Sequence, residues 1–202
     1  MFFKSMITIF LISIASASLA SAQISSWKEI RDHDVTRQKW DFSCGPASIS
    51  TLIKILSGTY VGERQLISEF FESIGDTDQQ KIVDQGFSLT DLEVMAERQG
   101  FHAEGVRLAG DSKLHEIGRP ALLYLEVEGF RHFAVYLAHK EGMVLLADPA
   151  QGNVWITVEA LQKAWSSKAA LYLWTDESRM PIVSDGPSTR GLAARTVLVR
   201  QR

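Results

Sequence analysis

The sequence predicts an α+β fold in which N-terminal helices pack on an antiparallel β-sheet. Apolar residues recur at helical spacing in several stretches between residues 45 and 99. From residue 101 to residue 174 the pattern changes to short apolar runs of strand length, separated by turn residues. Helices followed by strands are typical of the α+β class, whereas a parallel sheet would need the two to alternate.

Three helices are expected before residue 100. The first ends at Ser57-Gly58, and the third begins after Ser88, which stands at the N-cap with Asp91 three residues on. Residues 75–86 are polar and predict a loop. Residues 27–31 are expected to form one helical turn in a polar lead-in. The predicted helices cover residues 45–56, 63–74 and 89–99.

The second half is expected to form six strands and one short helix. Lys140-Glu141-Gly142 is typical of a hairpin turn between two of the strands. The periodicity stops after Asp176, so residues 176–202 predict a flexible tail and residues 23–175 a single domain. The predicted strands cover residues 101–108, 120–127, 133–138, 144–147, 152–156 and 169–174, with a helix over 158–165.

The N-terminus is typical of a secretory signal peptide. Lys4 provides a basic start, residues 7–20 are apolar, and Ala20-Ser21-Ala22 is a small-residue cleavage site. Residues 1–22 are therefore expected to be removed after Ala22, which predicts a periplasmic or secreted product. The alternative is an uncleaved membrane anchor. No later segment is long and apolar enough to predict stable membrane insertion after cleavage.

Composition excludes several classes of function. The formal net charge is −3 and no basic run occurs, which argues against nucleic-acid and lipid partners. The histidines and acidic residues show no metal-ligand spacing, so no metal and no other cofactor is expected. The chain has one cysteine, which excludes an intramolecular disulfide. In an oxidising compartment a lone thiol is either buried and inert or kept for its chemistry.

Cys44 lies directly before the first predicted helix. A thiol at a helix N-terminus is exposed to the positive end of the macrodipole and to free backbone N–H groups, both of which favour the thiolate. The same N–H groups can hold the oxyanion of a tetrahedral intermediate. Gly45 would let the backbone approach a substrate closely, and Pro46 suits the first helical turn. The alternative interpretation is a small buried apolar cysteine.

A cysteine nucleophile needs a base, and the base needs an orienting group. His132 begins one predicted strand and Asp148 ends the next. If the two strands form a hairpin, His132 and Asp148 lie side by side. Taken singly, His132 could be a capping residue and Asp148 an Asp-Pro turn starter. Gln38, six residues before Cys44, could donate a second hydrogen bond to an oxyanion or be an ordinary exposed side chain.

These segments together resemble the bacteriocin-processing, double-glycine-type cysteine peptidases over about residues 36–175. The resemblance is carried by Gln38, by Cys44-Gly45-Pro46-Ala47, by Arg131-His132-Phe133-Ala134-Val135 and by Ala147-Asp148-Pro149. It implies a papain-like fold. It also implies Cys44 as nucleophile, His132 as base and then acid, Asp148 as orienter and Gln38 as oxyanion donor.

Two features depart from that family's pattern. Ser43 stands where many relatives carry an acidic residue, which would alter local electrostatics or substrate preference and leave the triad intact. The best-known relatives are cytoplasmic domains of ATP-driven exporters that cut after a Gly-Gly pair, whereas this chain is expected to be exported with no ATPase following. Double-glycine specificity is therefore left open.

The sequence thus predicts a cysteine endopeptidase that cleaves an exported protein or peptide through an acyl-enzyme, with a dedicated exported partner as a possible substrate. Two alternatives stay open. One is a peptidase-like binding module without turnover, and the other is a cell-wall peptide amidase using the same triad. A redox role is not expected, because no second cysteine is present to resolve a disulfide.

Overall fold

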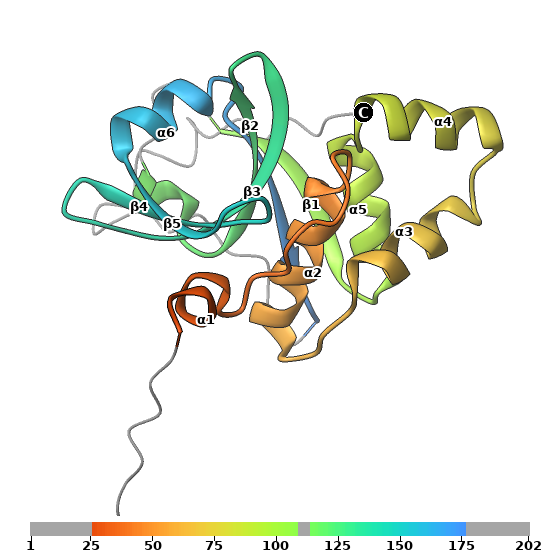
Figure 1. Ribbon diagram of the computed structural model, residues 1–202, viewed down its shortest axis with the longest axis horizontal. Coiled ribbons are helices and arrows are strands. Elements are labelled where there is room, and N and C mark those ends of the chain that lie inside the picture. The colour runs from red at the N-terminus through yellow and green to blue at the C-terminus, as the bar shows by residue number, and fades with distance from the viewer. Residues whose placement is uncertain (1–25, 109–113, 177–202) are drawn as a thin grey trace, which may run out of the picture.

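The computed structural model describes residues 26–108 and 114–176, without the side chains of His115 and Glu116. The predicted signal peptide (1–22) and residues 177–202 of the predicted tail lie outside the described residues. Within them, the predicted α+β class is confirmed: N-terminal helices pack on a six-stranded antiparallel sheet (Figure 1). No helix in this described part is long and apolar enough to cross a membrane.

The helices end where the sequence provides caps. Gly58, at φ +73°, closes α2 in the left-handed conformation, and its N–H bonds to Lys54 O. Ser88 and Asp91 form the predicted reciprocal cap at the start of α5. The α-helices are α1 (Trp27–Asp32), α2 (Cys44–Ser57), α3 (Glu63–Phe71), α4 (Asp76–Gln85), α5 (Leu89–Arg98) and α6 (Val158–Ala164). A short 3₁₀ helix, η1 (Leu114–Ile117), was not predicted.

The sheet has the order β1-β6-β2-β3-β4-β5, with every neighbouring pair antiparallel. The predicted turn joins β3 to β4 through Glu141 and Gly142, both at positive φ (52° and 76°), which suits the twist of a tight hairpin. The strands are β1 (His102–Arg107), β2 (Ala121–Val127), β3 (Phe130–Lys140), β4 (Met143–Asp148), β5 (Gly152–Thr157) and β6 (Ala169–Trp174).

Alternating strand residues build a hydrophobic core on each face of the sheet. On β3, Phe133 and Val135 belong to the cluster that includes residues of α2, α3 and α5. Ala134 and Tyr136 belong to the opposite cluster, which α6 covers with Leu161 and the following Trp165. Two-sided coverage explains why the central strands contain so few polar residues.

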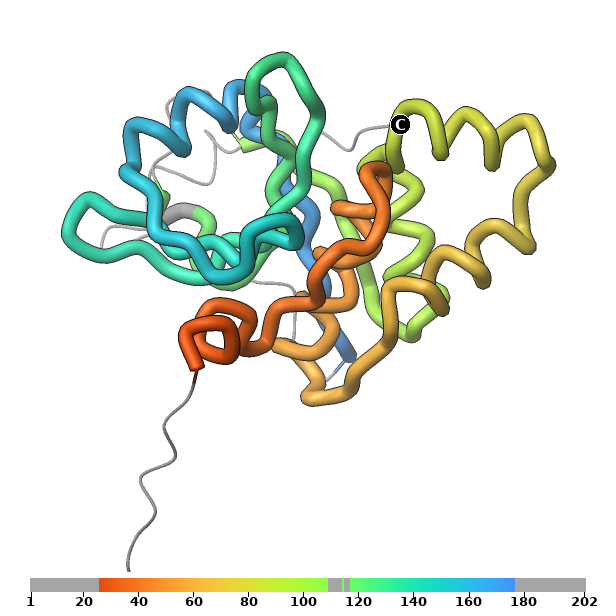
Figure 2. The backbone as a smooth tube through the Cα atoms, viewed as in Figure 1, coloured from red at the N-terminus to blue at the C-terminus, as the bar shows by residue number. Residues whose placement is uncertain are grey.

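The segment before α2 runs along the boundary between the helices and the β3–β5 strands (Figure 2). Gln38 N donates to Pro149 O at 3.0 Å, and Thr36 N donates to Thr51 Oγ1 at 2.9 Å. Ser48 Oγ in α2 donates to Phe133 O in β3 at 3.2 Å. These bonds fix the start of α2 against the two strands that carry His132 and Asp148.

Three predictions about elements were wrong. The predicted loop 75–86 contains a helix, α4, with Asp76 and Asp78 in its first turn and Gly86 capping its end. Its helical period was hidden because Ile82 is its only buried residue. The second helix ends at Phe71, three residues earlier than expected. Strand β3 begins at Phe130, so His132 is its third residue and does not begin it.

Candidate active site

Cys44 is the first residue of α2 and is partly buried. Ser43 occupies the N-cap without a side-chain hydrogen bond to the helix, and Pro46 has no N–H. The N–H groups of the first turn therefore lack helical partners and point along the helix axis beside the thiol. Gly45 has a packing role that the sequence did not reveal, since a Cβ there would lie 2.8 Å from Leu92 Cδ2 of α5.

His132 and Asp148 lie side by side, as expected if their strands form a hairpin. His132 Nε2 is 2.9 Å from Asp148 Oδ2, and their side chains are only 19% and 6% exposed. The Cys44 thiol is also within hydrogen-bonding reach of His132. Because Nε2 contacts the carboxylate, the other ring nitrogen, Nδ1, is left for the thiol. The structure therefore brings Cys44, His132 and Asp148 together around one imidazole.

The surroundings of His132 favour its charged form. Burial lowers the pKa of His132, but the hydrogen bonds to Asp148 and Cys44 outweigh burial and raise the pKa to about 9. An imidazolium between a carboxylate and a thiol is the arrangement that stabilises a thiolate.

Both carboxylate oxygens of Asp148 accept hydrogen bonds. Burial raises its pKa, but the bond to His132 and the N–H groups of Ala150 and Gln151 lower the pKa below the ordinary value. Those N–H groups donate to Oδ1 at 2.7 and 3.0 Å, leaving Oδ2 for His132. The Asp-Pro turn that the sequence offered as an alternative to function therefore also positions the carboxylate.

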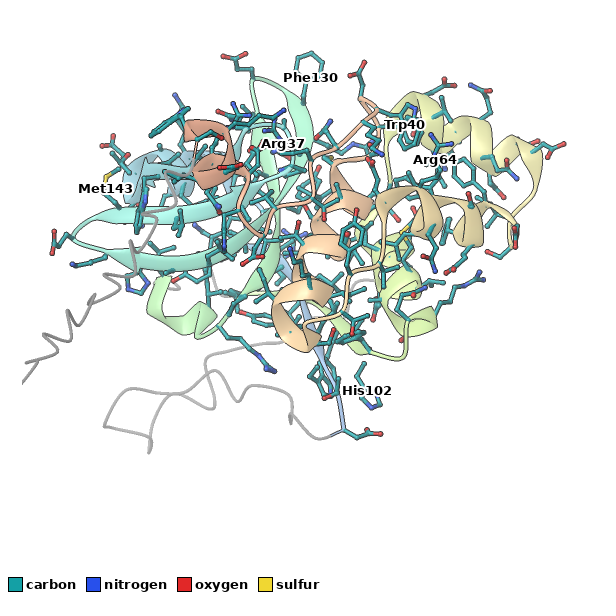
Figure 3. The ribbon with its side chains drawn as sticks, turned by 60° about the horizontal axis from the view of Figure 1, so that its bottom comes forward. Arg37, Trp40, Arg64, His102, Phe130 and Met143 are labelled. Carbon is teal, nitrogen blue, oxygen red and sulfur yellow. The ribbon has the colours of Figure 1, made fainter. Side chains whose placement is uncertain are left out.

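A cleft of about 370 Å³ opens on Cys44. One wall is the end of α4 with Gly86 and Phe87, and the other is the turn between β2 and β3 with Gly129 and Phe130. Phe130 is 75% exposed and projects from the top of the molecule in Figure 3, on the same side as Trp40. Arg131 Nη2 spans the two walls by donating to Gln85 O at 2.8 Å.

Gln38 lies in the segment leading to Cys44, but its side chain is already engaged. Its Nε2 donates to Trp40 O at 3.0 Å, and its buried Oε1 has no hydrogen-bond partner in the described part of the chain. The Nε2 group carries a second hydrogen that this bond does not use. The bond to Trp40 O therefore fixes the position of the Gln38 amide. Its predicted role as an oxyanion donor stays a prediction.

The other described histidines have partners away from the cleft. His102 pairs with Asp176 at 2.5 Å and stacks on Trp174, at the edge of the molecule opposite Phe130 (Figure 3). His33 contacts its neighbour Asp34, and His139 bonds to the Tyr136 hydroxyl. The predicted base, His132, is bonded to Asp148 instead, and its role stays a prediction.

Sequence reasoning missed one buried acidic residue near the site. Glu63, at the start of α3, accepts a hydrogen bond from Ser43 Oγ at 2.5 Å, next to Cys44 in the chain. A glutamate in the first turn of a helix normally indicates a solvated surface, so no local signal distinguished it. Across residues 26–108 and 114–176, no group of three or more His, Cys, Asp or Glu side chains could hold a metal ion.

Residues 32–178 match the sequence model of the Peptidase C39 family. The chain belongs to this family. The C39 peptidases are cysteine peptidases. The matched range includes all the residues of the site described above. The resemblance to bacteriocin-processing, double-glycine-type peptidases that the sequence motifs indicated is thereby confirmed.

One relative of this C39 peptidase is a protein of Pseudomonas aeruginosa named "Probable functional amyloid protease FapD". The two are 29% identical over 154 residues, which is 76% of this chain and 66% of the relative. The chain therefore matches just under two thirds of that relative's length.

Two solved structures share the fold. One is the peptidase domain of Streptococcus ComA, a bifunctional ABC transporter involved in quorum sensing, with TM-score 0.56 and 15% identity over 70% of this chain and 97% of that one. The other is a double glycine motif protease from an AMS/PCAT transporter in complex with its leader peptide, with TM-score 0.55 and 20% identity over 69% and 89%. These likenesses confirm the expected α+β fold, in which N-terminal helices pack on an antiparallel sheet.

Proposed function

We propose that this C39 peptidase is an endopeptidase that cleaves an exported protein with Cys44 as nucleophile, His132 as base and acid, and Asp148 as orienter. The observation that carries the proposal is the single imidazole of His132, which bonds to the Asp148 carboxylate and lies within hydrogen-bonding reach of the Cys44 thiol. Cys44 is the only cysteine in the chain, so it is the one thiol that could act as nucleophile.

The first half of the reaction forms the acyl-enzyme. The Cys44 thiolate attacks the scissile carbonyl carbon, and the carbonyl oxygen takes the negative charge of the tetrahedral intermediate. The Cys44 backbone N–H, free at the start of α2, stabilises this oxyanion, and the unused hydrogen of Gln38 Nε2 supplies the second bond. His132 then gives its proton to the leaving amine as the C–N bond breaks.

The second half releases the product. Neutral His132 takes a proton from water, and the resulting hydroxide attacks the thioester carbonyl. Collapse of this second intermediate breaks the C–S bond, restores the thiolate and leaves the imidazole protonated. Asp148 keeps the ring orientation and stabilises the imidazolium in both halves. Its tether to the N–H groups of Ala150 and Gln151 prevents the carboxylate from turning away.

We propose that the substrate is an exported protein that assembles at the cell surface. The signal-like residues 1–22 support export, and the relative named as a functional amyloid protease supports a substrate that assembles outside the cell. The cleft of about 370 Å³ at Cys44 lies between two walls, from α4 and from the β2–β3 turn, and could hold a segment of peptide. The chain would thus act on one partner protein in the periplasm or beyond it.

The test is a search for new chain ends. The purified protein is incubated with an unfolded exported proteome, and new N-termini are identified by mass spectrometry. The proposal predicts cleavage at a restricted set of sequences, lost in Cys44→Ala and His132→Ala. Those variants serve as matched controls for a contaminating peptidase.

Two outcomes would favour the alternatives. Equal numbers of new termini with wild type and Cys44→Ala would contradict the proposal and favour a binding module. The amidase alternative passes through the same kind of acyl-enzyme and is tested in a parallel incubation with purified cell wall. Release of cell-wall peptides there, with no protein cleaved in the first incubation, would favour it.

A further inference from the structure

A buried carboxylate lies beneath the segment that leads to Cys44. Glu63, the first residue of α3, is only 3% exposed. Within the described residues it has no ion pair, and its Oε2 is buried without a hydrogen-bond partner. Burying a carboxylate in this way costs free energy, so the bonds that it does make are of particular interest.

The other oxygen, Oε1, accepts two hydrogen bonds from the loop that precedes Cys44. It accepts hydrogen bonds from Lys39 N at 3.0 Å and from Ser43 Oγ at 2.5 Å. Ser43 Oγ also lies 2.8 Å from Trp40 O, but a hydroxyl has one proton to donate. The carboxylate is the stronger acceptor and the closer one, so the proton goes to Glu63.

Both proposed oxyanion donors depend on this loop. Ser43 is fully buried (0% exposed) and is peptide-bonded to Cys44, so its position sets the Cys44 N–H and thiol. Trp40 O accepts bonds from Ser43 N at 3.1 Å and from Gln38 Nε2 at 3.0 Å. The Trp40 ring is in turn covered by the guanidinium of Arg64, the residue next to Glu63, 5.6 Å from its centroid (Figure 3).

We propose that Glu63 is a positioning residue for the peptidase reaction. Through its bond to Ser43 Oγ it holds Cys44 against His132. Ser43 N in turn bonds to Trp40 O, the carbonyl that also fixes the Gln38 amide, so the same bond helps to place that amide. The inference rests on the roles proposed above for Cys44 and Gln38. A displacement of about 1 Å in such a site can cost roughly 100-fold in rate, so a tether outside the cleft can matter as much as a contact within it.

The test measures the alkylation rate of Cys44 by iodoacetamide against pH in the purified full-length protein. Every variant is first shown by circular dichroism to be folded under the assay conditions. Glu63→Ala and Ser43→Ala are expected to lower the rate near neutral pH by about 10-fold or more and to shift its rise to more alkaline pH, because a misplaced thiol loses the imidazolium partner that favours the thiolate. Glu63→Gln keeps an oxygen acceptor and is expected to fall between wild type and Glu63→Ala.

A double variant and a control variant complete the test. Because Ser43 and Glu63 act through one bond, the double variant Ser43→Ala/Glu63→Ala is expected to react no more slowly than the slower single variant. Glu159→Gln removes an exposed acid from the first turn of α6 and serves as the matched control, with no change expected.

A folded Glu63→Ala with the wild-type rate and pH profile would overturn the proposal. So would a loss of stability with an unchanged pH profile, since that pattern describes a purely structural residue. If wild type itself reacted slowly, like an ordinary thiol, the proposed catalytic roles would fail first. The failure of Glu63 as a positioning residue, with wild type still fast, is thus a separate outcome.

Discussion

Replacing Asp148 by asparagine should remove most of the pH dependence that His132 gives to folding stability. In the wild type, burial lowers the pKa of His132, and the bonds to Asp148 and Cys44 raise it to about 9. A histidine whose pKa is raised on folding stabilises the folded state fully below its unfolded pKa of about 6.5 and loses that contribution as the pH rises through about 9. The window of lost stability therefore lies between about pH 6.5 and 9.

The size of the effect follows from the same values. A rise from 6.5 to about 9 corresponds to about 3 kcal/mol, an upper limit because the imidazole is partly solvated. In Asp148→Asn, the amide oxygen of the new side chain can still accept the N–H bonds of Ala150 and Gln151, so the local turn should survive. The amide carries no charge to favour the imidazolium, so the pKa of His132 should fall, with burial opposed only by the interaction with Cys44.

The assay is urea unfolding followed by tryptophan fluorescence at about pH 6, 7.5 and 9.5. Wild type should lose about 2–3 kcal/mol across this range, and Asp148→Asn clearly less. The pair Cys44→Ala and Cys44→Ala/Asp148→Asn repeats the comparison without the titration of the thiol. If Asp148→Asn lost as much stability with rising pH as wild type, the carboxylate would not be what holds His132 charged.

Three further variants test the packing around the site. Gly45→Ala would place a Cβ 2.8 Å from Leu92 Cδ2 and should lower the free energy of unfolding by about 1–3 kcal/mol, measured in urea. Gly75→Ala is its matched control, because nothing lies within 4 Å of a Cβ there, and its stability should stay within about 1 kcal/mol of wild type. Arg131→Ala removes the bond to Gln85 O and should speed hydrogen exchange in α4, while unchanged exchange there would show that the two cleft walls are not linked by this arginine.

The parts of the fold that sequence predicted well are those governed by local rules. Ser88 with Asp91 forms the expected cap, and Gly58 closes α2 in the left-handed conformation. The turn at Glu141-Gly142 joins β3 to β4, but the register shifts between Tyr136 and Ala138 before Val135 pairs with Ala147. The hairpin still brings the start of β3 beside the end of β4, so the closeness of His132 and Asp148 could be predicted, whereas the register shift could not.

Helix α4 could not be predicted for the opposite reason. It buries only Ile82, and it is stabilised by acids in its first turn, by a Gln80–Asp84 side-chain bond and by Gly86 at its end. Such a helix lacks the apolar stripe that a periodicity analysis detects. It nevertheless supplies one wall of the cleft.

The roles of single buried residues near the site depend on packing between distant elements. Glu63 meets Ser43 only because α3 packs beside α2, and Gly45 is restricted only because α5 places Leu92 against it. Gln38 was chosen from the motif, but its bond to Trp40 O follows from a turn in a segment without periodicity. These contacts join residues whose local sequence carries no sign of the partner.

The Cys44–His132 pair is tested most directly by the rate of Cys44 alkylation by iodoacetamide as a function of pH, in wild type and in His132→Ala. We expect fast labelling of wild type well below about pH 8, because the imidazolium of His132 favours the thiolate, and much slower labelling of His132→Ala. Slow labelling in both proteins, rising only near the ordinary thiol pKa of about 8.5, would contradict the Cys–His pair and with it the proposed mechanism.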